Sequence, residues 1–111
     1  MNDTIVAIAT PPGRGGVGMV RVSGRSLSLM AATICGKQLS PRVAQHTHFL
    51  DVASQVIDDG LAIFFAGPAS FTGQDVLELH AHGSPMVLQA LVRRCVELGA
   101  RHAEQIGRAH V

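Results

Sequence analysis

The chain has 111 residues, a mass of 11.7 kDa and a formal net charge of +1, with 47% hydrophobic and 15% charged residues. This length fits one domain of roughly 100–150 residues, and the composition excludes an intrinsically disordered chain. The near-neutral charge argues against direct nucleic-acid binding, and no apolar run reaches the ~20 residues that span a bilayer.

The first part of the chain predicts two strands followed by a helix. Residues 4–10 form a β-branched run typical of a strand, which the Pro- and Gly-rich segment 11–16 ends. Residues 17–23 predict a second strand, whose alternation separates Met19, Arg21 and Ser23 from Val20 and Val22. Residues 24–35 predict a helix that Gly36 ends, with an apolar stripe made of Leu27, Met30, Ala31 and Ile34.

The second part predicts three strands and a final helix. In chain order we expect a strand over 45–52, a turn at Asp58-Asp59-Gly60, a buried strand over 61–65, a loop over 67–73 and a strand over 76–81. The last helix has Ser84 as its N-cap and Pro85 at its first position, and it ends at Gly99. Its expected buried stripe is Val87, Leu88, Leu91, Val92, Cys95 and Leu98, with Arg93, Arg94 and Glu97 in water. The predicted fold class is α/β, a two-layer α+β arrangement with a mixed sheet in the order β-β-α-β-β-β-α.

Two cysteines, Cys35 and Cys95, lie in apolar helical patterns. This placement predicts reduced, buried thiols that act as small hydrophobic residues rather than a disulfide. The N-terminus also lacks the basic region of a secretory signal. The expected location of the protein is therefore the cytoplasm.

A glycine-rich segment, Gly13 to Gly18, matches the G-x-G-x-x-G pattern of dinucleotide-binding sites. Such a site needs a helix that opens at the third glycine, because the helix N-terminus meets the pyrophosphate. Here the chain continues as a strand from Met19, and no acidic residue follows about 20 positions on. No Lys-Ser/Thr completes a P-loop, so we reject nucleotide binding by this segment.

Two charged residues lie within apolar strand patterns and are the candidate binding residues. Glu78 is either an edge-strand carboxylate in water or a ligand anchor, since a carboxylate can accept two parallel N–H groups of a heterocycle. Arg21 is rarely buried without a partner, so its tip reaches solvent, Glu78 or an acidic group of a ligand.

His80-x-His82 places two imidazoles on one strand face. Zinc sites need three or four ligands, and no nearby Cys-x-x-Cys or carboxylate pair completes this set. We therefore expect no metal ligand and no catalytic residue in this chain, and we interpret Ser70 and Thr72 as turn-forming residues.

Taken together, several motifs resemble the N-terminal domain of the MnmE (TrmE) family of tRNA modification GTPases. The segments that carry the likeness are Asp3-Thr4-Ile5-Val6-Ala7, Ala9-Thr10-Pro11-Pro12-Gly13-Arg14-Gly15-Gly16-Val17-Gly18, Arg21-Val22-Ser23-Gly24, Gly67-Pro68-x-Ser70-Phe71-Thr72-Gly73-x-Asp75-Val76-Leu77-Glu78 and His82-Gly83-x-Pro85. The likeness covers residues 3 to 103 in register and in order. The departures are Ala69, Gln74 and Ser84, where the family usually has Asn, Glu and Gly.

The resemblance implies a fold related to the folate-binding domain of aminomethyltransferases. It implies that the domain forms a homodimer and binds 5-formyl- or 5,10-methylene-tetrahydrofolate, and that Arg21 and Glu78 contact this cofactor. A further family contact, a lysine beyond this domain, has no counterpart here. In the family, a GTPase domain using GTP, Mg²⁺ and K⁺ follows, and a flavoprotein partner, MnmG (GidA), helps to modify the wobble uridine of tRNA.

The family domain thus corresponds to residues 1–105, truncated at its C-terminal end. Residues 106–111 resemble a translated sequencing adapter, and we expect them to be non-native. The chain alone is expected to have no turnover and no GTPase activity. Two alternatives stay open: a stand-alone, small folate-dependent aminomethyltransferase-like protein, or an inactive truncated fragment.

Overall fold

The computed structural model describes residues 3–9, 16–67 and 73–103. The expectations for the glycine-rich segment before Gly16, for Ser70 and Thr72, and for the tail after residue 103 lie outside these residues.

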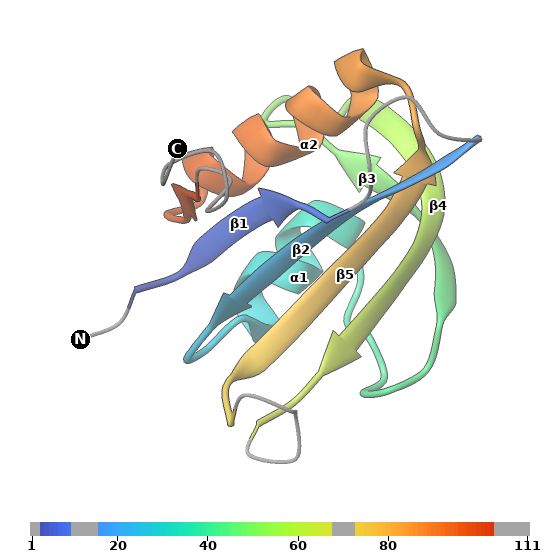
Figure 1. Cartoon of the computed structure of the whole chain (residues 1–111). Helices are drawn as coiled ribbons and strands as arrows, with labels where there is room; N and C mark the ends of the chain where they lie inside the picture. Colours follow the sequence, from blue (N-terminus) through green and yellow to red (C-terminus); the bar gives the residue numbers. More distant parts are fainter. Residues whose placement is uncertain (1–2, 10–15, 68–72, 104–111) are drawn as a thin grey trace.

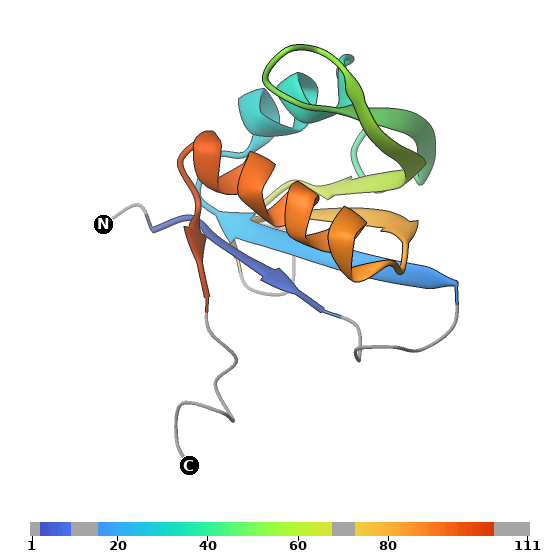
Figure 2. The same ribbon diagram turned by 90° about the horizontal axis from the view of Figure 1, so that it is seen from above.

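In the described ranges, the chain forms a six-stranded mixed sheet and two helices. The strands are β1 (Ile5–Ile8), β2 (Val17–Gly24), β3 (Gln45–Leu50), β4 (Val56–Phe65), β5 (Asp75–His82) and β6 (Arg101–His102), and the helices are α1 (Ser28–Cys35) and α2 (Pro85–Glu97). The order in the sheet is β3-β4-β5-β2-β1-β6, with β6 parallel to β1 and the other pairs antiparallel. Both helices lie on the same side of the sheet (Figures 1 and 2), so the predicted two-layer α+β class is confirmed.

The core lies between the helices and one face of the sheet. Strand alternation sends Val20 and Val22 of β2 and Leu77 and Leu79 of β5 into it, and all four are fully buried. The helices and Leu27, the residue before α1, complete it; the helical residues are Met30, Ala31, Ile34, Leu88, Leu91, Val92 and Cys95. The predicted faces of β2 are thereby confirmed, and β5 alternates in the same way. On the opposite side of the sheet, called here the open face, the described residues place no helix (Figure 2).

Side-chain hydrogen bonds lie at the start of each helix. The Ser84 hydroxyl accepts hydrogen bonds from the backbone N–H groups of Met86 and Val87, as an N-cap should. Helix α1 begins later than the predicted residue 24, because β2 continues to Gly24, which pairs with Asp75. The Asp75 carboxylate then accepts the N–H of Leu27 at 2.9 Å, just before α1 begins.

The predicted turn at Asp58-Asp59-Gly60 is wrong, because these residues lie inside β4. Gly60 is required by a close approach of strands: a Cβ built there would lie 1.9 Å from the carbonyl oxygen of His80. The chain turns earlier, where the Asp51 carboxylate accepts the N–H groups of Ala53 and Gln55. The Asp58-Asp59-Gly60 sequence is therefore part of a strand that packs closely against β5, and it does not form a chain turn.

The prediction that Arg94 faces water is also wrong. Its side chain is only 8% exposed, and its Nε–H donates to the backbone carbonyl of Leu50 at 2.9 Å. Nη1 also lies 3.4 Å from the Glu97 carboxylate. The aliphatic stem can therefore be buried while the guanidinium stays hydrogen-bonded.

Both edges of the sheet have features that the sequence analysis does not predict. The short strand β6 was missed, because a two-residue strand leaves almost no pattern. At the other edge, the Lys37 ammonium follows α1 and donates to the backbone carbonyl of His46 in β3 at 2.9 Å.

Neither α1 nor α2, the helices in the described part of the chain, has the length and apolar character of a membrane-spanning segment.

Cys35 and Cys95 are buried and free, as predicted. Burial raises the pKa of the Cys35 thiol to about 11 and that of the Cys95 thiol to about 12. Neither thiol is therefore activated as a nucleophile.

Candidate functional site

Arg21 and Glu78 face each other across the centre of the sheet. The strands β2 and β5 pair antiparallel with these two residues in register, so their side chains leave the same face side by side. Nη2 of Arg21 lies 3.4 Å from Oε2 of Glu78, with side chains 49% and 18% exposed. Of the partners considered for Arg21, the structure pairs it with Glu78.

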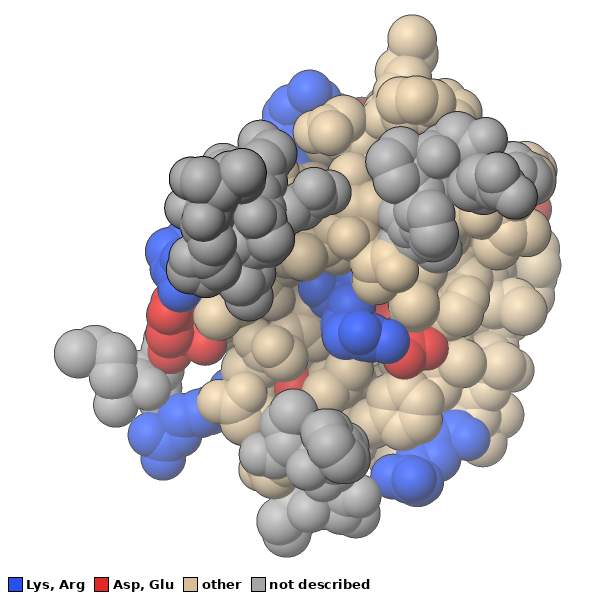
Figure 3. All heavy atoms as spheres, viewed as in Figure 1, with Lys and Arg blue, Asp and Glu red and all other residues tan. Residues whose placement is uncertain are grey.

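The pair lies on the open face, with apolar neighbours in its own row of the sheet. In the same row across the sheet, Ala7 of β1 is opposite Arg21, and Ile63 of β4 is opposite Glu78. Around the few blue and red atoms near the middle of this face, much of the surface belongs to residues other than Lys, Arg, Asp and Glu (Figure 3). A charged pair in apolar surroundings can orient a flat, polar-edged ligand, whose rings contact the apolar side chains.

Glu78 has a second partner that the sequence reasoning missed. His80, two residues further along β5, places Nε2 3.0 Å from Oε1 of Glu78, and its side chain is 29% exposed. The two carboxylate oxygens therefore contact different groups, Arg21 on one side and His80 on the other. The period of two in Glu-x-His was the available signal, since it puts both side chains on one face.

His82 does not join this group. Its Nδ1 lies 2.9 Å from Oδ2 of Asp58, and the same carboxylate accepts the backbone N–H of His82. The hydrogen bond and the charge of Asp58 raise the pKa of His82. Burial raises the pKa of Asp58, but the hydrogen bonds from His82 outweigh it and leave that pKa lowered.

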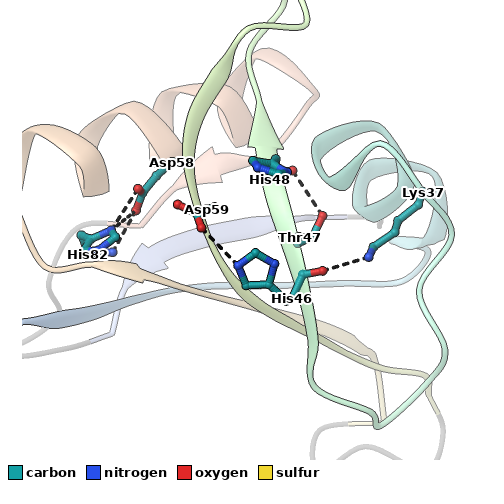
Figure 4. Close-up of polar contacts among 7 residues, drawn as sticks. All are labelled: Lys37, His46, Thr47, His48, Asp58, Asp59 and His82. Atoms are coloured by element: carbon teal, nitrogen blue, oxygen red, sulfur yellow. Dashed lines mark hydrogen bonds and ion pairs between the residues drawn. The ribbon is translucent and has the colours of Figure 1, made fainter.

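A third histidine–carboxylate pair joins β3 to β4. His46 Nε2 lies 3.1 Å from Asp59, while Asp58 turns toward His82 on the other side of β4 (Figure 4). Within residues 3–9, 16–67 and 73–103, no three His, Cys, Asp or Glu side chains are grouped to hold a metal ion.

Two grooves on the molecule lie away from the Arg21–Glu78 pair. The larger, of about 520 Å³, lies beside α1 and β3 and is lined in part by Lys37, His46 and His48. The smaller, of about 260 Å³, includes Leu29 and Gly99. Neither Arg21 nor Glu78 lines either groove. The candidate site formed by these two residues is therefore separate from both grooves.

Comparison with known proteins gives a consistent result. The family model described as "GTP-binding protein TrmE N-terminus" matches residues 4–106. The chain is 58% identical over 101 residues to the tRNA modification GTPase MnmE of Neisseria gonorrhoeae, covering 91% of this chain and 22% of that protein. The corresponding proteins of Nitrosomonas eutropha and Pseudomonas paraeruginosa are 58% and 59% identical, over 93% and 91% of this chain and 23% and 22% of theirs. The chain thus spans about a fifth of the length of these relatives.

Proposed function

The chain belongs to the family of the TrmE N-terminus, and on that premise we propose that it is a tetrahydrofolate-binding and homodimerisation module of a tRNA-modifying GTPase. The observation that carries the proposal is the Arg21–Glu78 pair on the open face. The named relatives are tRNA modification GTPases, and this chain corresponds to about a fifth of their length.

The donor set of the site fits a reduced folate. The pterin ring of 5-formyl- or 5,10-methylene-tetrahydrofolate presents adjacent N–H groups, and the Glu78 carboxylate can accept both. Arg21, half exposed, supplies a positive charge for a carbonyl or acidic group of the same molecule. Ile63 beside Glu78 offers apolar contact for the rings.

Homodimerisation would use apolar side chains of the open face. Leu61, directly opposite His80, is 44% exposed, and Ile63 and Phe65 further along β4 are only partly covered. Apolar strand surface without a covering layer favours association with a second copy. The strands β4 and β5 would then lie at or near the interface.

The remaining steps of the proposal concern the longer protein. There, GTP, Mg²⁺ and K⁺ would act in a separate GTPase domain, and the flavoprotein MnmG (GidA) would be the partner in modifying the wobble uridine of tRNA. The module would work in the cytoplasm and would not bind tRNA directly, which its net charge of +1 supports.

Titration of the chain with 5-formyltetrahydrofolate by calorimetry tests folate binding. Glu78→Gln keeps the size of the side chain but replaces one acceptor oxygen by a donor, and we expect affinity to fall about tenfold or more. Asp59→Asn is the matched control, since Asp59 is a carboxylate of the same sheet that pairs with His46. Unchanged affinity in Glu78→Gln would contradict the assignment.

Sedimentation equilibrium with and without 5-formyltetrahydrofolate tests the dimer. Leu61→Lys places a charge on the open face and should shift the mass toward the monomer. Val52→Lys, in the turn between β3 and β4, is the control because Val52 is 77% exposed and lies off the sheet. Equal association of the two variants would argue against the open face as the interface.

A further inference from the structure

The Glu78 carboxylate is held from both sides before any ligand binds. Nε2 of His80 lies 3.0 Å from one oxygen, and Nη2 of Arg21 lies 3.4 Å from the other. Because an ionised carboxylate only accepts hydrogen bonds, Nε2 of His80 must carry the proton in this contact. His80 is therefore a donor to Glu78, and its Nδ1 is left as the second ring nitrogen.

These two contacts leave acceptor capacity for a ligand. A carboxylate has about four lone-pair sites, and one on each oxygen is used by His80 and Arg21. One site on each oxygen is left, which is the arrangement that two parallel N–H donors require. In a free Glu side chain the terminal torsion angle has a broad distribution. A hydrogen-bond donor on each oxygen therefore restricts the carboxylate to one orientation.

We infer that His80 is a positioning residue for the ligand-binding carboxylate: it fixes Glu78 in the orientation that accepts a pair of parallel N–H groups from a heterocycle. The inference rests on the proposed function, because it assigns Glu78 to the ligand. His80 acts through Glu78 and not by its own contact with the heterocycle.

The surroundings of His80 support this role over a purely structural one. Its neighbours in the same row of the sheet are Met19 of β2 and Leu61 of β4. In the described part of the chain, the ring of His80 makes its hydrogen bond with Glu78 of the same strand, so the imidazole does not tie β5 to another strand. With 29% of the side chain exposed, its removal leaves the core on the other face intact.

Three substitutions at one position test the inference by calorimetric titration with 5-formyltetrahydrofolate. His80→Ala should weaken binding about tenfold, because the hydrogen bond to a charged group and the fixed orientation are both lost. His80→Gln should restore most of the affinity, since its amide nitrogen reaches the position of Nε2. His80→Asn should stay as weak as His80→Ala, because its shorter amide corresponds to Nδ1.

A double-mutant cycle separates positioning from direct contact. In a Glu78→Gln background, His80→Ala should cause less than a twofold further loss, because the group on which His80 acts has changed. The thermal midpoint of each free variant, measured in parallel, should stay within a few degrees of the wild type. A midpoint that fell in proportion to affinity would assign His80 a structural role and overturn the inference.

The outcomes also separate this inference from the proposed function. If the wild type binds and Glu78→Gln does not, but His80→Ala binds like the wild type, His80 has no positioning role and only the inference fails. If His80→Ala is equally damaging in both backgrounds, His80 contacts the ligand directly and the inference is again wrong. If the wild type does not bind at all, the proposed function fails and the inference with it.

Discussion

Gly60 is the position where a single added methyl group should be most informative. A Cβ at residue 60 would lie 1.9 Å from the carbonyl oxygen of His80, whereas real Cβ atoms stay at least 3.0 Å from such atoms. Gly60→Ala therefore forces β4 and β5 at least about 1.1 Å apart at this point. The pairs Leu61↔His80 and Ala62↔Leu79 follow immediately, and the second of these is fully buried.

The expected loss follows from that displacement. One or two ladder hydrogen bonds would be stretched or broken, at about 0.5–1.5 kcal/mol each, and core packing would loosen in addition. The lower chain entropy of Ala in the unfolded state opposes this by about 0.4–1 kcal/mol. We expect a net destabilisation of about 2 kcal/mol, which in a domain of this size lowers the melting temperature by roughly 10 °C.

Urea denaturation followed by far-UV circular dichroism measures this loss. Gly16→Ala is the matched control, because a Cβ there meets nothing within 4 Å and no left-handed backbone conformation is involved. Equal unfolding midpoints for the two variants would show that β4 and β5 do not approach each other this closely.

Three further outcomes are expected. Arg94→Met should destabilise the fold by about 1–2 kcal/mol in urea, because it leaves a β3 carbonyl without its donor, whereas the exposed neighbour Arg93→Met should have almost no effect. The pKa of His82 is raised above its ordinary 6.5, so the stability it gains from Asp58 is complete below that pH and is lost as pH rises through the raised value. The pKa of Asp58 is lowered below 3.8, so its share is lost only as pH falls through that lowered value, and Asp58→Asn should differ most from the wild type between pH 3.8 and 6.5. A urea midpoint difference that grew above pH 8 would contradict this coupling. Finally, Cys95, whose pKa burial raises to about 12, should react with a maleimide only as fast as the domain unfolds, and rapid labelling of the native protein would refute its burial.

The strand faces were predictable because they follow from a simple period. Alternation over β2 and β5 put Arg21 and Glu78 on the face opposite the core, and the register of the two strands then paired them. The start of α2 was equally predictable, since Ser84 and Pro85 are local signals that need no distant partner.

Contacts between distant segments were not predictable in the same way. Nothing local distinguishes Gly60 in a turn from Gly60 under the carbonyl of His80, because the difference lies in β5. The position of Arg94 in the helical pattern is that of a surface residue. Its guanidinium is nevertheless buried, because it donates a hydrogen bond to a backbone carbonyl of β3. The two-residue spacing of Glu78 and His80 shows in the sequence that they share a strand face. That Arg21 contacts the other carboxylate oxygen depends on the pairing of β2 with β5, which the sequence does not show.

The structure of the two sheet edges bears on how copies of this domain can assemble. A strand edge with free backbone groups can pair with a strand of another copy, and repeated pairing of this kind produces a fibril. At β3 the Lys37 ammonium already occupies the His46 carbonyl, and at the other side β6 offers only two residues for pairing. If copies associate as proposed, these edges favour face-to-face contact, which is complete after two copies, over edge-to-edge contact, which can continue indefinitely.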